Sequence, residues 1–151
     1  MMTIRPIATV AFFLIMNSMV TSCSKDDKTV SPGLNAAQVK TIIIVDTWKV
    51  SHYDEAGIDH TSDFSGYAFT FNTDKTLVGT DSSATKNGTW DATAESGLVK
   101  IPIDFTPTET TGPFESISDD WFVMTASNTE ITLKHTSGDD GSIDLLTFEK
   151  I

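Results

Sequence analysis

The chain has 151 residues, of which 21 are acidic and 10 are basic, giving a formal net charge of −11, and it contains one cysteine, Cys23. An acidic surface repels phosphate groups, so the charge excess excludes nucleic acid as a partner. A single cysteine excludes an intrachain disulfide and a cysteine-based metal site, so the stability of the domain must come from packing.

The N-terminal stretch has the pattern of an export signal. Arg5 precedes a largely apolar run over residues 7–20, which is shorter than the roughly 20 residues of a membrane-spanning helix. The run ends in Val20-Thr21-Ser22-Cys23, which resembles the recognition sequence of the bacterial lipoprotein pathway. We therefore expect a lipoprotein signal peptide over residues 1–22 and acylation at Cys23. The alternative is cleavage by the general signal peptidase, which would release a soluble product.

A charged cluster directly follows the cysteine. Lys25, Asp26 and Asp27 resemble the export tag that sends lipoproteins of one Gram-negative lineage to the outer face of the outer membrane. We therefore expect a protein that is lipid-anchored in the outer membrane and faces the cell exterior. The same charges also suit a plain solvated tether. In either case, residues 23–33 are expected to form a flexible tether and residues 34–151 one domain.

The pattern after residue 34 predicts a short helix followed by strands. Asn35–Asp46 has apolar residues at helical spacing, with Asn35 as the N-cap. Beyond it, β-branched and aromatic residues alternate with polar ones between turn signals. Eight strands are expected: Thr47–Tyr53, Phe64–Asn72, Thr76–Asp81, Ala84–Ala92, Val99–Phe105, Trp121–Ser127, Glu130–His135 and Ser142–Lys150.

This succession predicts an all-β fold, an eight-stranded antiparallel meander that closes into a barrel, because closure removes exposed sheet edges. A β-sandwich is the alternative. Pro102 cannot donate to a ladder, so we expect its strand to be an edge or to be bulged there. Thr106–Asp119 contains two prolines and a glycine and is expected to form a long loop with a single helical turn.

Aromatic residues on the inner faces of these strands are expected to form the core. Trp48, Phe69, Phe71 and Trp121 alternate with polar neighbours, which places each on an inner face. The other aromatic residues either fill the core or line a cavity, because an eight-stranded barrel is just wide enough for one small ligand.

Several short motifs resemble those of a known family. Trp48-Lys49-Val50 opens the first strand, Gly88-Thr89-Trp90 follows mid-chain, and Asp120-Trp121 and Leu146-Thr147-Phe148 come later. In order and spacing they resemble the lipocalin-like domains of bacterial outer-membrane and surface lipoproteins, over about residues 34–151. True lipocalins carry their Gly-x-Trp pattern on the first strand, whereas here it is mid-chain. The resemblance implies a lipocalin-like barrel and a non-enzymatic binding function.

The chain lacks a strong catalytic or metal-binding motif. His52, His60 and His135 lie on separate predicted elements without the spacing of metal ligands. No Gly-x-Ser-x-Gly nucleophile elbow occurs, and the acid-rich turns do not match a calcium-binding loop. We therefore expect no enzymatic activity, no metal and no cofactor.

Ligand or partner binding is the expected function, and the site is expected near the long loop Thr106–Asp119. Alternate connections of a meander lie at the same end, so Asp54–Asp63 shares an end with Thr106–Asp119. Long loops in compact domains are often functional, so we predict a ligand site at Tyr53, Phe114 and Ile117. The expected ligand is a small apolar molecule or an envelope protein. A carbohydrate-binding accessory lipoprotein is the alternative, and an inhibitor or structural envelope component is a weaker one.

Overall fold

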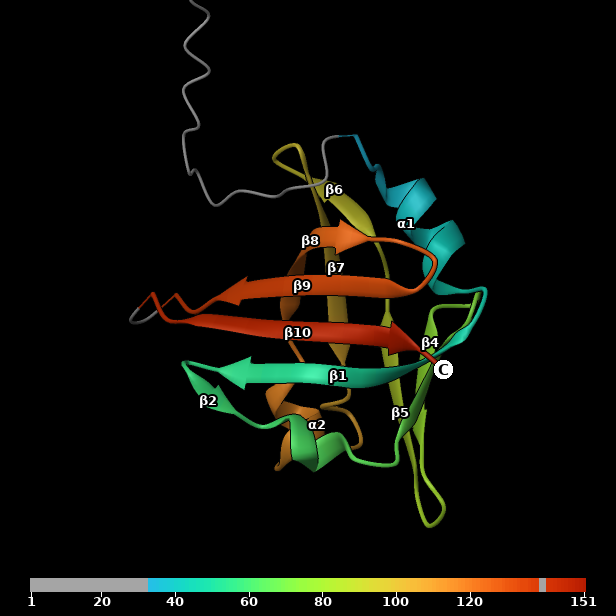
Figure 1. The fold of residues 1–151 in the computed structure, drawn as a ribbon, viewed down its shortest axis with the longest axis vertical. Helices are drawn as coiled ribbons and strands as arrows, with labels where there is room; N and C mark the ends of the chain where they lie inside the picture. Colours follow the sequence, from blue (N-terminus) through green and yellow to red (C-terminus); the bar gives the residue numbers. More distant parts are fainter. Residues whose placement is uncertain (1–32, 139–140) are drawn as a thin grey trace, which may run out of the picture.

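In the computed structural model, which describes residues 33–138 and 141–151, the predicted meander is a closed barrel (Figure 1). Among the described residues, eight strands make the wall: β1 (Thr47–Glu55), β3 (Ala68–Phe71), β4 (Thr76–Thr80), β5 (Thr85–Trp90), β7 (Leu98–Asp104), β8 (Asp120–Ala126), β9 (Glu130–Thr136) and β10 (Ile143–Lys150). Each pairs antiparallel with the next, and β10 pairs back onto β1 from Trp48↔Lys150 to Asp54↔Leu145. Closure confirms the barrel and shows that the β-sandwich alternative is wrong.

Two short strands extend this wall. β2 (Ile58–Asp59) pairs with the end of β1, and β6 (Thr93–Glu95) pairs with β7. Pro102 was expected on an edge or a bulge, but β7 lies inside the sheet and pairs with β8 through Pro102↔Asp120. The edge prediction is therefore wrong. Pro102 is accommodated because the ladder on the other side of β7 is divided between β5, at residues 103–104, and β6, at residues 98–100.

The predicted N-terminal helix covers one end of the barrel. α1 (Ala36–Ile43) begins at Asn35, whose side chain accepts from the main-chain N–H of Gln38 at 3.0 Å in a complete capping box. The helix is shorter than the predicted Asn35–Asp46, because the chain leaves the helix at Ile44 and enters β1 at Thr47. Val39 and Ile43 are fully buried in the core. Among the described residues, no helix has the length and hydrophobicity needed to cross a bilayer.

Ion pairs tie α1 to the wall. Asp91 follows β5 and contacts the ammonium of Lys40 on α1 at 2.6 Å and that of Lys75 at 2.9 Å. Hydrogen bonds from these two lysines hold the pKa of the Asp91 carboxyl well below its usual range. The carboxylate therefore stays charged and keeps both lysines at the α1 end.

The four predicted core residues are buried. Trp48 and Phe69 are 0% exposed, and Phe71 and Trp121 are 1% exposed, which confirms the inner-face assignment. Phe64 was expected to begin the second strand, but it lies in the 3-10 helix η1 (Thr61–Phe64), and β3 begins only at Ala68. Gly66, at φ +86°, turns the chain between Phe64 and the strand, a conformation that glycine adopts at little cost.

All three tryptophans fasten neighbouring segments to the wall. The indole N–H of Trp48 donates to the carbonyl of Ile43 at the end of α1, at 2.8 Å. The indole N–H of Trp90 donates to Asn72 at 3.0 Å, and that of Trp121 donates to Ile117 at 2.9 Å. Each buried ring thus also satisfies its polar N–H, as a buried tryptophan requires.

Candidate functional site

The interior of the barrel is filled at the end opposite α1. The loop 105–119 carries the one-turn helix α2 (Pro113–Ser116), which confirms the predicted long loop with a single helical turn. Phe114 on this turn points into the barrel, and its ring contacts four others, with centroid distances of 4.9–5.8 Å: Phe64, Tyr67, Phe69 and Phe105. Such edge and offset contacts are favourable aromatic geometries.

Two glycines in the wall make this filling possible. A Cβ at Gly79 would lie 2.8 Å from the ring of Phe114, and a Cβ at Gly88 would lie 2.7 Å from the ring of Phe105. Both positions therefore require glycine: at Gly79 an aromatic ring occupies the space of a side chain, and at Gly88 the main-chain oxygen of Asp104, 2.6 Å from such a Cβ, occupies it together with the ring of Phe105. Gly88 belongs to the Gly88-Thr89-Trp90 motif, and this close packing gives that motif a structural role.

The structure brings the predicted ligand residues together at this end. Tyr53, Phe114 and Ile117 are 2%, 4% and 0% exposed, and the hydroxyl of Tyr53 donates to the carbonyl of Ser116 at 3.2 Å. Burial, with added repulsion from nearby carboxylates such as that of Glu55, raises the pKa of Tyr53, so its hydroxyl stays a donor. These three residues pack together at the end of the barrel that Phe114 fills. Their role in ligand binding stays a prediction.

A small acidic hollow lies outside this end. It has a volume of about 220 Å³ and is lined in part by Tyr53, Glu55, His60 and Asp63. His60 lies 3.2 Å from the Asp63 carboxylate and 4.0 Å from that of Glu55. Among residues 33–138 and 141–151, no three His, Cys, Asp or Glu side chains gather closely enough to hold a metal ion.

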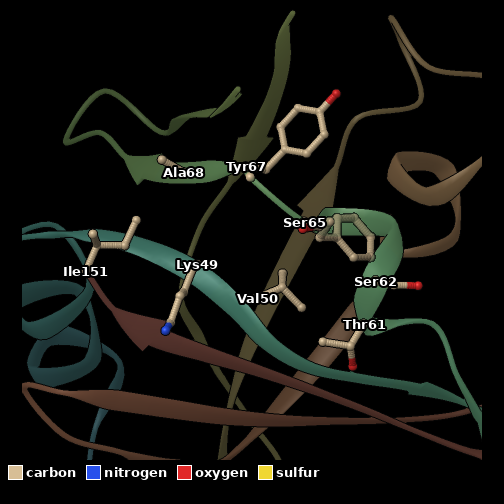
Figure 2. Close-up of a pocket in the computed structure, with 10 residues that line it drawn as sticks. Lys49, Val50, Thr61, Ser62, Ser65, Tyr67, Ala68 and Ile151 are labelled. Carbon is tan, nitrogen blue, oxygen red and sulfur yellow. The ribbon is translucent and has the colours of Figure 1, made fainter. Parts of the chain in front are cut away.

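A larger pocket opens through the wall between β1 and β3 (Figure 2). Its volume is about 400 Å³, within the range of about 300–1,000 Å³ that is usual for ligand sites. Ten residues from β1, η1, the following turn, the start of β3 and the C-terminal end line it: Lys49, Val50, Thr61, Ser62, Phe64, Ser65, Gly66, Tyr67, Ala68 and Ile151. We call this the side pocket.

The side pocket exists because β1 and β3 separate after two residue pairs. The strands are paired at Thr47↔Thr70 and Trp48↔Phe69, and the turn that ends in Tyr67 then carries the chain away from β1. Beyond the gap, Tyr53 joins the two segments again, since its carbonyl accepts from the N–H of His60 at 2.8 Å and its own N–H donates to the hydroxyl of Thr61 at 2.9 Å. The gap is thus closed at both ends.

The side pocket is apolar at its base and polar at its rim. Val50 and Phe64 are buried at 8% and 2% exposure, whereas Lys49, Ser62 and Ser65 are exposed. In Figure 2 the side chain of Val50 points into the gap, and the ammonium of Lys49 lies on the other side of β1. None of the ten lining residues is acidic, although the chain carries a net charge of −11. An apolar base with a few polar groups around it is the usual composition of a binding pocket.

Sequence reasoning missed the side pocket. Ser65-Gly66, inside the run that was expected to be a continuous strand from Phe64 to Asn72, is the one local signal for it. The predicted lipidation site Cys23 and the predicted export tag Lys25, Asp26 and Asp27 lie outside the described residues.

Comparisons with known proteins show similarity at the level of structure. No protein-family model matches the chain, and no curated protein matches it. Among solved structures, the chain is similar to the crystal structure of a DUF4847 family protein from Bacteroides vulgatus. The identity is 17%, the match covers 74% of this chain and 96% of that chain, and the TM-score is 0.49. At this identity, no residue role passes from that protein to this chain, whose own residues define the barrel and its side pocket.

Proposed function

We propose that this protein is a lipid-anchored, surface-exposed lipoprotein whose barrel is a non-enzymatic binding module, with the side pocket as its binding site. The side pocket carries the proposal: it is a hollow of about 400 Å³ with an apolar base. It suits a small apolar ligand or an apolar side chain of an envelope protein. The sequence Val20-Thr21-Ser22-Cys23 supports the anchor, and the Lys25-Asp26-Asp27 cluster supports surface display.

Two observations favour the side pocket as the binding site over a cavity inside the barrel or a sugar-binding face on its surface. The interior near α2 holds Phe114 and the rings around it, so little space remains there for a ligand. The three tryptophans are 4% exposed or less, so their faces are not offered at the surface for stacking on sugars. Stacking on a ring requires an accessible aromatic face, and this disfavours the carbohydrate-binding alternative.

Blocking the side pocket is expected to abolish its binding of a simple apolar probe. Ala68 lies on its rim, and Ala68→Phe would fill the hollow with a ring. Titration of the full chain with 1-hexanol, followed by calorimetry, should show binding that is at least about tenfold weaker in this variant. Thr70→Phe, on the same strand and the same outer face, is the matched control and should bind like the wild-type chain. Equal binding by Ala68→Phe, or no binding by the wild-type chain, would contradict the proposed site.

A further inference from the structure

The side pocket receives main-chain groups of β1 that a neighbouring strand would otherwise pair. Successive residues of a strand direct their N–H and C=O groups to opposite neighbours. The carbonyl of Thr47 accepts from the N–H of Ile151 at 3.0 Å on the β10 side, whereas Trp48 pairs with Phe69 on the β3 side. By this alternation, the N–H and C=O of Val50 face the β3 side, where the side pocket lies.

The strand partner that these groups of Val50 lack can be identified. The next hydrogen-bonded pair of the β1–β3 ladder would join Val50 to Tyr67, but the N–H of Tyr67 donates to the carbonyl of Phe64 at 3.1 Å. Among the described residues, the hydrogen bonds from the main chain of β1 to residues 60–67 are both made by Tyr53. Val50 therefore offers an N–H donor and a C=O acceptor, side by side, to an occupant of the side pocket.

The shape of the gap selects a compact occupant. One end of the gap is closed by the pair Trp48↔Phe69. The other end is closed by Tyr53, whose N–H donates to the hydroxyl of Thr61 and whose carbonyl accepts from the N–H of His60. An extended chain would have to continue along β1 past one of these ends. A single ring that enters from outside needs only the space between them, and the hollow of about 400 Å³ is large enough for it.

The lining of the side pocket selects a neutral polar group. None of the ten lining residues is acidic, and the ammonium of Lys49 lies on the other side of β1 (Figure 2). A carboxylate only accepts hydrogen bonds and an ammonium only donates them, so neither can pair with both main-chain groups of Val50. A trans amide directs its planar N–H and C=O in opposite directions, whereas a cis amide holds them side by side. The cis amide therefore matches the two groups of Val50.

We propose that the side pocket binds a small neutral molecule through a cis-amide edge, as in a lactam or a primary carboxamide. The amide C=O accepts from the N–H of Val50, and the adjacent amide N–H donates to the C=O of Val50, in place of the pair that Tyr67 does not make. The apolar remainder of the molecule lies against the side chains of Val50 and Phe64. This inference rests on the proposed function, because it takes the side pocket to be the binding site and narrows the chemistry of its ligand.

The test compares three rings of equal size on the full chain labelled with ¹⁵N: caprolactam, N-methylcaprolactam and cycloheptanone. Caprolactam should bind about tenfold more tightly than the other two, because both of them lack the N–H that the carbonyl of Val50 requires. On saturation with caprolactam the amide proton of Val50 should shift downfield, whereas that of Lys49, which faces β10, should change little. Ala68→Phe should abolish the binding of caprolactam, and the matched control Thr70→Phe should leave it unchanged.

The outcomes separate this inference from the function on which it rests. Support requires both the preference for caprolactam and the downfield shift at Val50. If either is missing while 1-hexanol or one of the rings still binds at the side pocket, the amide inference is wrong and the proposed function stands. If neither the rings nor 1-hexanol shift the signals of Val50 and Ala68, both are wrong.

Discussion

Replacing Phe114 with alanine is expected to lower the free energy of unfolding by about 3–5 kcal/mol, the usual cost of truncating a buried aromatic residue. Phe114 is 4% exposed, and its ring contacts four other aromatic rings at the α2 end. Its loss would leave a cavity that the rigid wall around it can fill only in part. Urea unfolding followed by tryptophan fluorescence measures the change.

Phe122 provides the matched control for this substitution. It lies on β8 next to the buried Trp121, but it faces outward and is only partly buried. Phe122→Ala should therefore cost clearly less than Phe114→Ala. If the two variants lose the same stability, or if Phe114→Ala unfolds at the wild-type urea concentration, α2 does not fill the barrel as described.

Cys23→Ser is expected to abolish lipid attachment completely, because the acyl groups of a bacterial lipoprotein are built on that sulfur and on the amine of the same residue. Cells grown with labelled palmitate should label the wild-type chain and leave the variant unlabelled. Equal labelling of both chains would contradict lipid attachment at Cys23. A single acyl chain holds a protein only marginally at a membrane, whereas two or more hold it firmly, so the variant should also leave the membrane fraction.

The predicted export tag is tested separately, in a chain that keeps Cys23. Replacement of Lys25, Asp26 and Asp27 by alanine should keep the palmitate label and remove the accessibility of the protein to protease on whole cells. Unchanged accessibility would show that these three residues act only as a solvated tether.

The alternation of apolar and polar residues along the strands made most of the fold predictable. Phe69 and Phe71 on β3 have a strict period of two, and both are buried, because a strand directs successive side chains to opposite faces. Asn35 also carries a local signal, since its side chain can satisfy free N–H groups at a helix start. Eight such strands without intervening helices leave few arrangements other than a closed meander.

The candidate site was less predictable because it depends on contacts between distant segments. The spacing of Phe114 in its loop does not reveal that its ring enters the barrel, which follows from the space left by Gly79. The Ser65-Gly66 turn could be recognised as a break in a strand, but its consequence depends on where β1 passes. The side pocket arises only when the unpaired stretch of β1 lies opposite that turn.

The most direct test of the side pocket as the binding site is methyl NMR of the full chain during titration with 1-hexanol. The side pocket contains the methyl groups of Val50 and Ala68, whereas those of Leu77, Ile101 and Leu133 belong to the filled core. We predict that the first two residues shift with a single dissociation constant while the three core residues do not move. Shifts that begin at Leu77, Ile101 or Leu133 and leave Val50 and Ala68 unchanged would place the ligand inside the barrel and contradict the account.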